Sequence, residues 1–437
     1  MRTTDSKRIT LLTNFEARGT KQEEKLSGFS AFLVLFKSCV GLGIFSYPYA
    51  FGKAGYFYGM ILSVFICYIT TYGMYKLTVI SSEIEKETND EVLIDDYHFL
   101  AQYVAENYKS ERLGIVISGF AVWGTILNNV SIIIASIIEV STHLESFIGI
   151  DQIYIKFGIL SFYLVVSTYA LKPEKLKIFS AVSGFLIIMT AVAMYIDNIR
   201  ILLPSNQISN LTYEKFNLAN TGIFLGMAGF AYEACGTIFT VRMAMKDPHY
   251  TPKLITYVFT FIGAVFIMLS LSFYFAYGVE GLRPIAFEFY PQDTRPFMYL
   301  IGVVFCVCLV LFVPMLNISN SDLLEHYEII GLHTRGSDGL RSNTRLVIFR
   351  LLLFIVSAAP AFITNKIELV MNIEGSLVIP FISYYIPVAL NYMNEKNHGR
   401  PILAFQLIHD SFVFICGVGF LILGLTYSIQ SILNPDK

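Results

Sequence analysis

The chain has 437 residues, of which 55% are hydrophobic and 15% are charged. A soluble protein normally carries about a quarter of charged residues, so this composition excludes a soluble domain and indicates a polytopic membrane protein. The formal net charge of −2 gives no sign of a nucleic-acid partner.

Residues 1–27 are polar and basic, so we expect a disordered tail there and no cleavable signal peptide. Eleven apolar runs follow, each close to the roughly 20 residues that a helix needs to cross a bilayer. We place them at 28–50, 56–80, 113–141, 152–171, 176–198, 219–241, 253–278, 297–319, 345–363, 367–392 and 402–432. A short interfacial helix is expected within 91–111, where apolar residues stand among acidic ones.

Charge predicts the orientation of these spans. Of 31 Lys and Arg residues, 21 lie in segments on the side of the N-terminus and 7 on the other side. The positive-inside rule therefore places the N-terminus in the cytoplasm. One sequon, at Asn210, falls in the largest loop on the opposite side, where glycosylation is allowed.

All six cysteines lie within apolar runs, and no Cys/His spacing typical of a metal site occurs. We therefore expect no disulfide framework, no metal and no cofactor. The seven histidines are scattered, and no convergent catalytic set is visible, so an integral-membrane enzyme is not expected.

Two glycines and a proline interrupt the first apolar run. Gly41 and Gly43 destabilise a helix, because glycine loses much backbone entropy in it. Pro48 removes a backbone donor and clashes with the carbonyl of Ile44. An unwound segment in mid-membrane needs protein or water as its partner, because lipid offers no hydrogen bonds. Secondary transporters build substrate sites in this way. The alternative is a kinked helix whose glycines serve close packing.

The sixth run is predicted to be broken as well. It holds four glycines, and Glu233 lies between the last two, Gly229 and Gly236. A carboxylate near the bilayer centre needs a partner, a proton or water. The two breaks are five spans apart, and five helices invert the topology, so the two halves are predicted to be inverted repeats with a transport site between them.

The residues around both breaks resemble a known family. The first span runs from Lys37 to a closing Pro48-Tyr49-Ala50-Phe51-Gly52-Lys53-Ala54-Gly55. The sixth contains Phe230-Ala231-Tyr232-Glu233 and ends in Met245-Lys246-Asp247-Pro248. Both resemble signatures of the amino acid/auxin permease family, in particular its proton-assisted amino acid transporters.

The resemblance covers nearly the whole transmembrane region. It implies the LeuT-like fold of the APC superfamily, with eleven helices, a 5+5 inverted repeat, discontinuous first and sixth helices, alternating access and amino acid substrates. The tail would then be 1–27 and the transporter domain 28–432, with repeats at about 28–198 and 219–392 and an eleventh helix at 402–432. The sequence departs from the family's pattern at Ser38-Cys39 and at Glu368 and Glu374 of the tenth span.

An amino acid presents a carboxylate and an ammonium at a fixed separation. Backbone N–H groups at the break and at the following helix N-terminus are our candidates for the carboxylate: those of Gly41, Leu42, Gly43 and Ile44. Backbone carbonyls are our candidates for the ammonium: those of Cys39, Phe230 and Ala231. Three side chains are candidates for lining the pocket: Tyr232, Asn128 and Asn129. For the two asparagines the alternative is hydrogen bonding between helices, and for Tyr232 it is a side chain that points toward lipid.

Proton coupling is expected at Glu233, with Glu374 as the second candidate. The alternative for Glu233 is a permanent partner for a polar group or for Lys37. A sodium site remains open and would use oxygens of the eighth span, from Asn317, Ser319 or Ser321.

The sequence thus predicts a proton-driven transporter of small neutral amino acids. Cationic substrates, sodium coupling, or a membrane amino acid sensor with little flux are the alternatives. Both the plasma membrane and a vacuolar or lysosome-like membrane fit this topology.

Overall fold

The computed structural model describes residues 25–89, 94–169, 177–203, 211–285, 296–326 and 339–434. Most of the predicted tail and the sequon at Asn210 lie outside these ranges. Within them the regular structure is helical, apart from an isolated β-bridge between Leu26 and Met245. The architecture is therefore all-α, as expected.

The first half contains α2 (Gly28–Cys39), α3 (Gly43–Ala54), α4 (Tyr56–Glu87), α5 (Tyr97–Tyr108), α6 (Glu111–Ile148), α7 (Gln152–Tyr169) and α8 (Lys177–Leu202). The second half contains α9 (Thr221–Ala231), α10 (Cys235–Ala244), α11 (Thr251–Gly281), α12 (Pro296–His326), α13 (Gly339–Ala358), α14 (Ile367–Ile379), the π-helical turn η7 (Pro380–Tyr385), α15 (Ile386–Asn397) and α16 (Ala404–Leu433).

Eight described helical stretches are long and apolar enough to span a membrane, and α2 with α3 makes a ninth. Two shorter apolar helical stretches, 152–166 and 346–362, occupy the places predicted for the fourth and ninth spans. The helices thus fall where the eleven spans were expected, and the full count of eleven depends on these two. The expected interfacial helix is α5, whose Asp96 side chain accepts a hydrogen bond from the N–H of Tyr97 and caps its start.

Both predicted breaks are present. α2 ends at Cys39, α3 begins at Gly43, and the two axes differ by 58°. α9 ends at Ala231 and α10 begins at Cys235. Pro48 lies inside α3 rather than at the first break, so the glycines, and not the proline, mark where the first helix unwinds.

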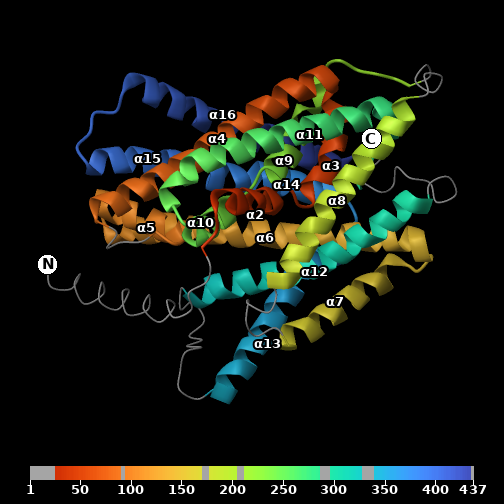
Figure 1. Ribbon diagram of the computed structural model, residues 1–437, viewed down its shortest axis with the longest axis horizontal. Coiled ribbons are helices and arrows are strands. Elements are labelled where there is room, and N and C mark those ends of the chain that lie inside the picture. Colours follow the sequence, from red (N-terminus) through yellow and green to blue (C-terminus); the bar gives the residue numbers. More distant parts are fainter. Residues whose placement is uncertain are drawn as a thin grey trace.

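The first four spans of the two halves meet in pairs, whereas α8, the fifth span of the first half, packs on α11 and α12. α2 packs on α10, α3 on α9, α4 on α11, α6 on α12 and α7 on α13. Each pair joins equivalent members of the first and second halves, which is the arrangement that a two-fold relation between inverted repeats produces. Figure 1 shows α3, α9 and α14 in the middle, with α4 and α11 above them and α6 and α12 below.

Glycine allows α9 and α14 to touch backbone to backbone. A Cβ added to Gly375 would lie 1.8 Å from the carbonyl oxygen of Gly226, and one added to Gly229 would lie 2.8 Å from the carbonyl oxygen of Gly375. Glycine at such interfaces is the usual means of close helix packing in membranes. The contact places α14 directly beside the second break.

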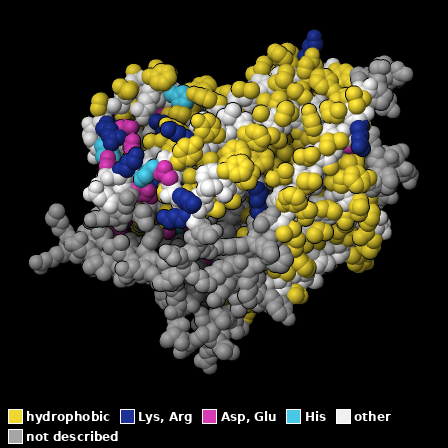
Figure 2. Space-filling model, in the orientation of Figure 1, with side chains coloured by type: hydrophobic (Ala, Val, Ile, Leu, Met, Phe, Trp, Pro, Cys, Tyr) yellow, Lys and Arg dark blue, Asp and Glu magenta, His cyan; other side chains and the backbone are white. Residues whose placement is uncertain are grey.

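Charged side chains gather at one end of the molecule. Arg400 bridges Glu83 and Glu87, and His398 also contacts Glu87. Figure 2 shows such side chains at the left end, where α5 and the end of α15 lie, and mainly hydrophobic side chains over the upper and right-hand parts of the face that are coloured. This distribution matches a protein with an aqueous end and a lipid-facing flank.

Candidate functional site

The two breaks lie against each other at the centre of the helix bundle. A Cβ added to Gly43 would lie 2.7 Å from both Cα and Cβ of Ala231. Glycine is therefore the residue that lets the start of α3 approach the end of α9 so closely. The sequence predicted two breaks, and the structure brings them into contact.

The first break presents backbone donors. The N–H of Val40 donates to the carbonyl of Phe36, and that of Phe45 donates to the carbonyl of Leu42. Among the described residues, no backbone acceptor meets the N–H groups of Gly41, Leu42, Gly43 and Ile44. The start of a helix also carries partial positive charge. These four donors, which the sequence proposed for a substrate carboxylate, are thus adjacent and available for an anion.

The second break presents backbone acceptors. The N–H of Glu233 donates to the carbonyl of Phe230 at 3.4 Å, a long bond. Within the described ranges, no backbone donor meets the carbonyl of Ala231 or that of Cys39 at the end of α2. Acceptors therefore lie near the donors of the first break, as a zwitterionic ligand requires.

Glu233 is held by hydrogen bonds on both of its carboxyl oxygens. Oε2 accepts from Nδ2 of Asn128 at 2.9 Å, and Oε1 accepts from the N–H of Cys235 at 2.6 Å. The second bond places the carboxylate at the N-terminus of α10, where partial positive charge favours it. Asn128, which is 4% exposed, thus joins α6 to the second break.

Asn129 and Tyr232 point elsewhere. Nδ2 of Asn129 donates to Oδ1 of Asn320 on α12 at 2.8 Å, which is the interhelical bond named above as the alternative. Tyr232 is fully buried, and its ring lies 5.1 Å from that of Phe266 on α11 and 6.0 Å from that of Tyr47. It packs in the protein core rather than toward lipid.

Glu374 lies inside α14 and is 2% exposed. Neither of its carboxyl oxygens has a hydrogen-bond partner among the described residues. The next residue is Gly375, whose backbone touches α9. The second coupling candidate is therefore buried at the α9–α14 contact and not near a helix end.

A buried ion pair at the far end of α10 was not anticipated. Two nitrogens of Arg242 contact the two oxygens of Glu85 on α4 at 2.6 Å each, with side-chain exposures of 0% and 3%. Glu85 also accepts from the N–H of Ile94, just before α5. The signal was a glutamate and an arginine that each follow the end of a predicted span, 56–80 and 219–241, on the same side of the membrane, but nothing local pairs them.

A second polar cluster joins α4, α15 and α16. Asp410 is buried and accepts hydrogen bonds from Tyr72 and from Asn391, and Lys76 donates to Asn391 at 3.2 Å. We infer a structural role, because this cluster lies outside the contact between the breaks and fixes α16 to the bundle.

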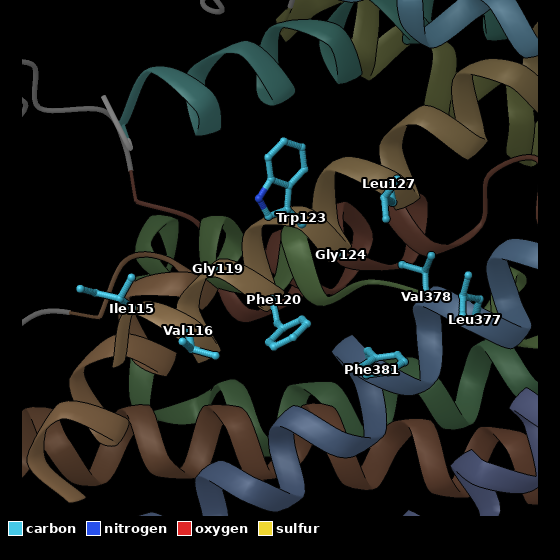
Figure 3. Close-up of a pocket in the computed structure, with 10 residues that line it drawn as sticks. All are labelled: Ile115, Val116, Gly119, Phe120, Trp123, Gly124, Leu127, Leu377, Val378 and Phe381. Atoms are coloured by element: carbon cyan, nitrogen blue, oxygen red, sulfur yellow. The ribbon is translucent and has the colours of Figure 1, made fainter. Parts of the chain in front are cut away.

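One groove of the described structure includes no residue of either break. It has a volume of about 570 Å³, and the side chains of α6 and α14 line it together with Phe381 of η7. Figure 3 shows Trp123, Phe120 and Phe381 around it. All its lining residues are apolar or glycine, and Trp123 is 51% exposed. Such a groove faces the bilayer and offers nothing to an ammonium or a carboxylate.

Comparisons with known proteins identify relatives of this chain. A family model described as "Transmembrane amino acid transporter protein" matches residues 24–430. Vacuolar amino acid transporter 3 of Saccharomyces cerevisiae is 22% identical over 409 residues, which cover 91% of this chain and 56% of that protein. Amino acid transporter ANT1 of Arabidopsis thaliana is 24% identical over 409 residues, which cover 90% and 89%. This chain therefore spans little more than half the length of the yeast relative.

Solved structures were also compared. A Na+-coupled sialic acid symporter in its substrate-bound outward-open state has 13% identity and a TM-score of 0.48, with 93% and 90% of the two chains covered. A manganese transporter of Eremococcus coleocola, in a mutant form, has 12% identity and a TM-score of 0.49, with 92% and 94% covered.

Proposed function

Because this chain belongs to the family of transmembrane amino acid transporter proteins, we propose that it is a secondary active transporter of small neutral amino acids. One observation carries the proposal, namely the contact between the two helix breaks at Gly43 and Ala231. It puts unpaired backbone donors and acceptors together at the centre of a membrane protein, where a zwitterion supplies the partners that lipid cannot.

The substrate carboxylate binds the N–H groups at the start of α3, and the ammonium binds carbonyls at the ends of α2 and α9. Three side chains around this backbone are buried and apolar, those of Cys39, Leu42 and Ile44. They favour a small substrate without charge on its side chain. Alternating access then exposes the contact between the breaks to one side of the membrane at a time.

Protons drive the transport, and the two buried carboxyls, Glu233 and Glu374, are the candidates for the residue that carries them. Sodium is the weaker choice, because one of the oxygens proposed for it already accepts from a cation. Nε of Arg350 donates to Oγ of Ser321, and the same guanidinium pairs with Asp322 at 3.0 Å. Nδ2 of Asn317 donates to the backbone carbonyl of Arg350. The positive charge beside Oγ of Ser321 opposes a second cation there.

Cationic amino acids are the second candidate substrates. The supporting observation is Glu374, a buried carboxyl without a hydrogen-bond partner in the described part of the chain. A guanidinium or ammonium side chain that reached it would satisfy both of its oxygens. The test below therefore includes arginine.

The orientation and the location of the protein are proposed from its charge distribution and from the name of one relative. The excess of Lys and Arg on the N-terminal side supports a cytoplasmic N-terminus. The plasma membrane and a vacuolar or lysosome-like membrane both fit, and the name of the yeast relative favours the second. In either membrane, the proposed proton flow is toward the cytoplasm.

Uptake into proteoliposomes tests the function. Purified protein is reconstituted, a proton or a sodium gradient is imposed separately, and radiolabelled alanine, proline, glutamine and arginine are offered. Accumulation of the neutral substrates under the proton gradient alone supports the proposal. Accumulation under sodium alone removes the proton from it, and a preference for arginine selects the cationic alternative. Binding without uptake under any gradient would indicate the sensor.

A further inference from the structure

The two central carboxyl groups have opposite surroundings, although they lie near each other in the bundle. Glu233 has a hydrogen-bond donor on each oxygen, whereas Glu374 has none among the described residues. We propose that Glu374 is the residue that binds and releases the coupling proton, and that Glu233 remains an ionised cap that positions α10. This inference rests on the proposed function and divides its two carboxyls between two roles.

Glu233 has the environment of a permanent anion. Its two donors are an amide side chain and a backbone N–H, and neither depends on a change of protonation. The N-terminus of α10 adds partial positive charge at the same place. Protonation would convert an acceptor into a donor that faces other donors. The geometry therefore favours one charge state of Glu233 throughout the cycle.

Glu374 has the environment of a neutral acid. Its side chain is 2% exposed, and the described part of the chain supplies no hydrogen bond to either oxygen. A buried carboxylate without a partner has a large desolvation penalty, and the group takes up a proton instead. In the conformation of this structure Glu374 thus holds a proton that it must release when water reaches it.

The charges on the surrounding helices do not supply a cation for Glu374. α9, α16 and η7 contain no Lys or Arg, and α6 contains only Arg112, in its first turn. Lys366 precedes α14 by one residue, eight residues before Glu374, or about 12 Å along the helix axis.

Glu233 lies in the break that follows α9, three residues after Phe230, whose backbone nitrogen would lie 2.7 Å from a Cβ added to Gly375. The other carboxyl and imidazole groups of the packed helices are Glu111, Glu139, His143 and Glu145 of α6, Glu368 of α14, and His409 and Asp410 of α16. Glu139 stands on α6, eleven residues beyond Asn128, which is about 16 Å of helix. On α16, the carbonyl of Gly424 accepts a hydrogen bond from Asn372 of α14, so Gly424 marks where α16 meets α14. Asp410 is fourteen residues from Gly424, or about 21 Å along α16. The permanent charge on Glu233 therefore opposes ionisation of Glu374, and nothing nearby favours it.

The position of Glu374 couples it to the transport cycle. It stands beside Gly375, where α14 touches the backbone of α9 at Gly226 and Gly229. Any movement that separates α14 from the broken helix admits water to this contact. The carboxylic acid then ionises and its proton passes to that water, and reclosure requires a proton from whichever side the contact faces. One proton is carried with each neutral substrate, and no other reactant is needed.

Three variants separate the two roles in proteoliposomes. Glu374→Gln keeps the shape and mimics the protonated acid, and Glu368→Gln is the matched control in the first turn of the same helix. Glu233→Gln keeps an oxygen for the N–H of Cys235, and its new NH₂ group can donate to Oδ1 of Asn128 once that amide turns over, because Oδ1 has no partner among the described residues. Each variant is assayed for alanine exchange without a gradient and for accumulation under a proton gradient.

We expect Glu374→Gln to keep exchange, to lose accumulation and to show exchange that no longer varies between pH 5 and pH 8. A gradient of about one pH unit drives at most about tenfold accumulation for one proton, and this factor should fall to one. Glu368→Gln should keep both the accumulation and the pH dependence. Glu233→Gln should exchange more slowly, because the cap of α10 loses its charge, and its pH dependence should move to lower pH, because the charge that opposed ionisation of Glu374 is gone. It should still accumulate alanine under the proton gradient. Accumulation by Glu374→Gln, or loss of accumulation with retained exchange in Glu233→Gln, would overturn the assignment. Absence of any alanine transport by the unaltered protein would instead refute the proposed function.

A chemical probe covers the case in which Glu374→Gln fails to fold. A hydrophobic carbodiimide, dicyclohexylcarbodiimide, adds to the protonated form of buried carboxyls and gives a stable N-acylurea. Applied to the unaltered protein and followed by peptide mass spectrometry, it should label Glu374 and not Glu233. Label on Glu233 with none on Glu374 would show that the roles are reversed, whether or not the protein transports.

Discussion

Gly43→Ala should destabilise the protein, because the two helix breaks leave no room for a methyl group between them. The new Cβ would lie 2.7 Å from Cα and Cβ of Ala231. Carbon atoms in contact stand about 3.5–4.0 Å apart, so α3 and α9 would have to separate by roughly 1 Å. One of the two contacted atoms is backbone, so a change of rotamer cannot relieve the clash.

The expected cost follows from two opposing terms. Overpacking of this kind costs about 1–3 kcal/mol, and alanine in place of glycine in a helix recovers about 0.5–1 kcal/mol of backbone entropy. The net loss in the free energy of unfolding is then between about 0 and 2.5 kcal/mol, centred on about 1 kcal/mol. Because the separation also pulls the donors of α3 away from the carbonyls of α9, the affinity for substrate should fall as well.

Gly41→Ala is the matched control, two residues away in the same break. A Cβ there would meet nothing within 4 Å, so the stability should stay unchanged or rise slightly. Thermal unfolding of the purified proteins in detergent measures both variants, and substrate binding by the same samples reports the site. If Gly43→Ala is as stable as Gly41→Ala, the two breaks are not in contact, and the argument for a site between them fails.

Three further predictions concern other parts of the chain. Arg242→Met should lower the free energy of unfolding by about 3–5 kcal/mol, because it leaves Glu85 charged and buried without its partner. Thermal unfolding measures this loss. Adding Glu85→Leu should restore much of the stability, whereas a purely steric defect at Arg242 would persist in the double variant. Burial lowers the pKa of His398, but the carbonyl and the Glu87 carboxylate that its ring contacts raise it more, so the pKa lies above its ordinary value. The stability that protonated His398 contributes is complete below about pH 6.5 and is lost as the pH rises through the folded-state pKa. His398→Gln should therefore lower the unfolding temperature at pH 6 more than at pH 8. An equal loss at both pH values would contradict the pKa argument. Asn210→Gln should abolish any glycosidase-sensitive shift in electrophoretic mobility, and a shift that persists would place the glycan elsewhere.

The positions of the helices and of the breaks were predictable from local residues. Apolar runs of about 20 residues mark spans because the bilayer has a fixed thickness. Gly41 and Gly43 mark the first break because glycine is costly in a helix. The second break, at 232–234, contains no glycine, and the glycines that indicated it lie inside α9 and α10, where Gly226 and Gly229 pack against α14. Pro48 was the less accurate indicator, since it lies inside α3 and not at the break.

The assignment of partners required the tertiary structure. The sequence identified Glu233 and Glu374 as carboxyl groups within predicted spans. It did not show which of the two has hydrogen-bond donors on its oxygens and which, among the described residues, has none. Which state each adopts depends on Asn128, more than a hundred residues from Glu233 in the chain. The same holds for Arg242 and Glu85, 157 residues apart. A pairing of this kind depends on the register of two packed helices, which no local pattern encodes.

What the sequence determined by itself is the backbone chemistry of this protein: where it spans the membrane, where it unwinds, and which carboxyls enter the apolar interior. These follow from the cost of each residue type in a helix or in lipid, which is a property of the residue and its immediate neighbours. Only the tertiary structure decided that the two breaks meet at Gly43 and Ala231, that α14 lies directly against α9, and that one of two similar carboxyls is satisfied while the other is not. Those outcomes depend on which surfaces pack together, and packing is decided by the whole chain at once.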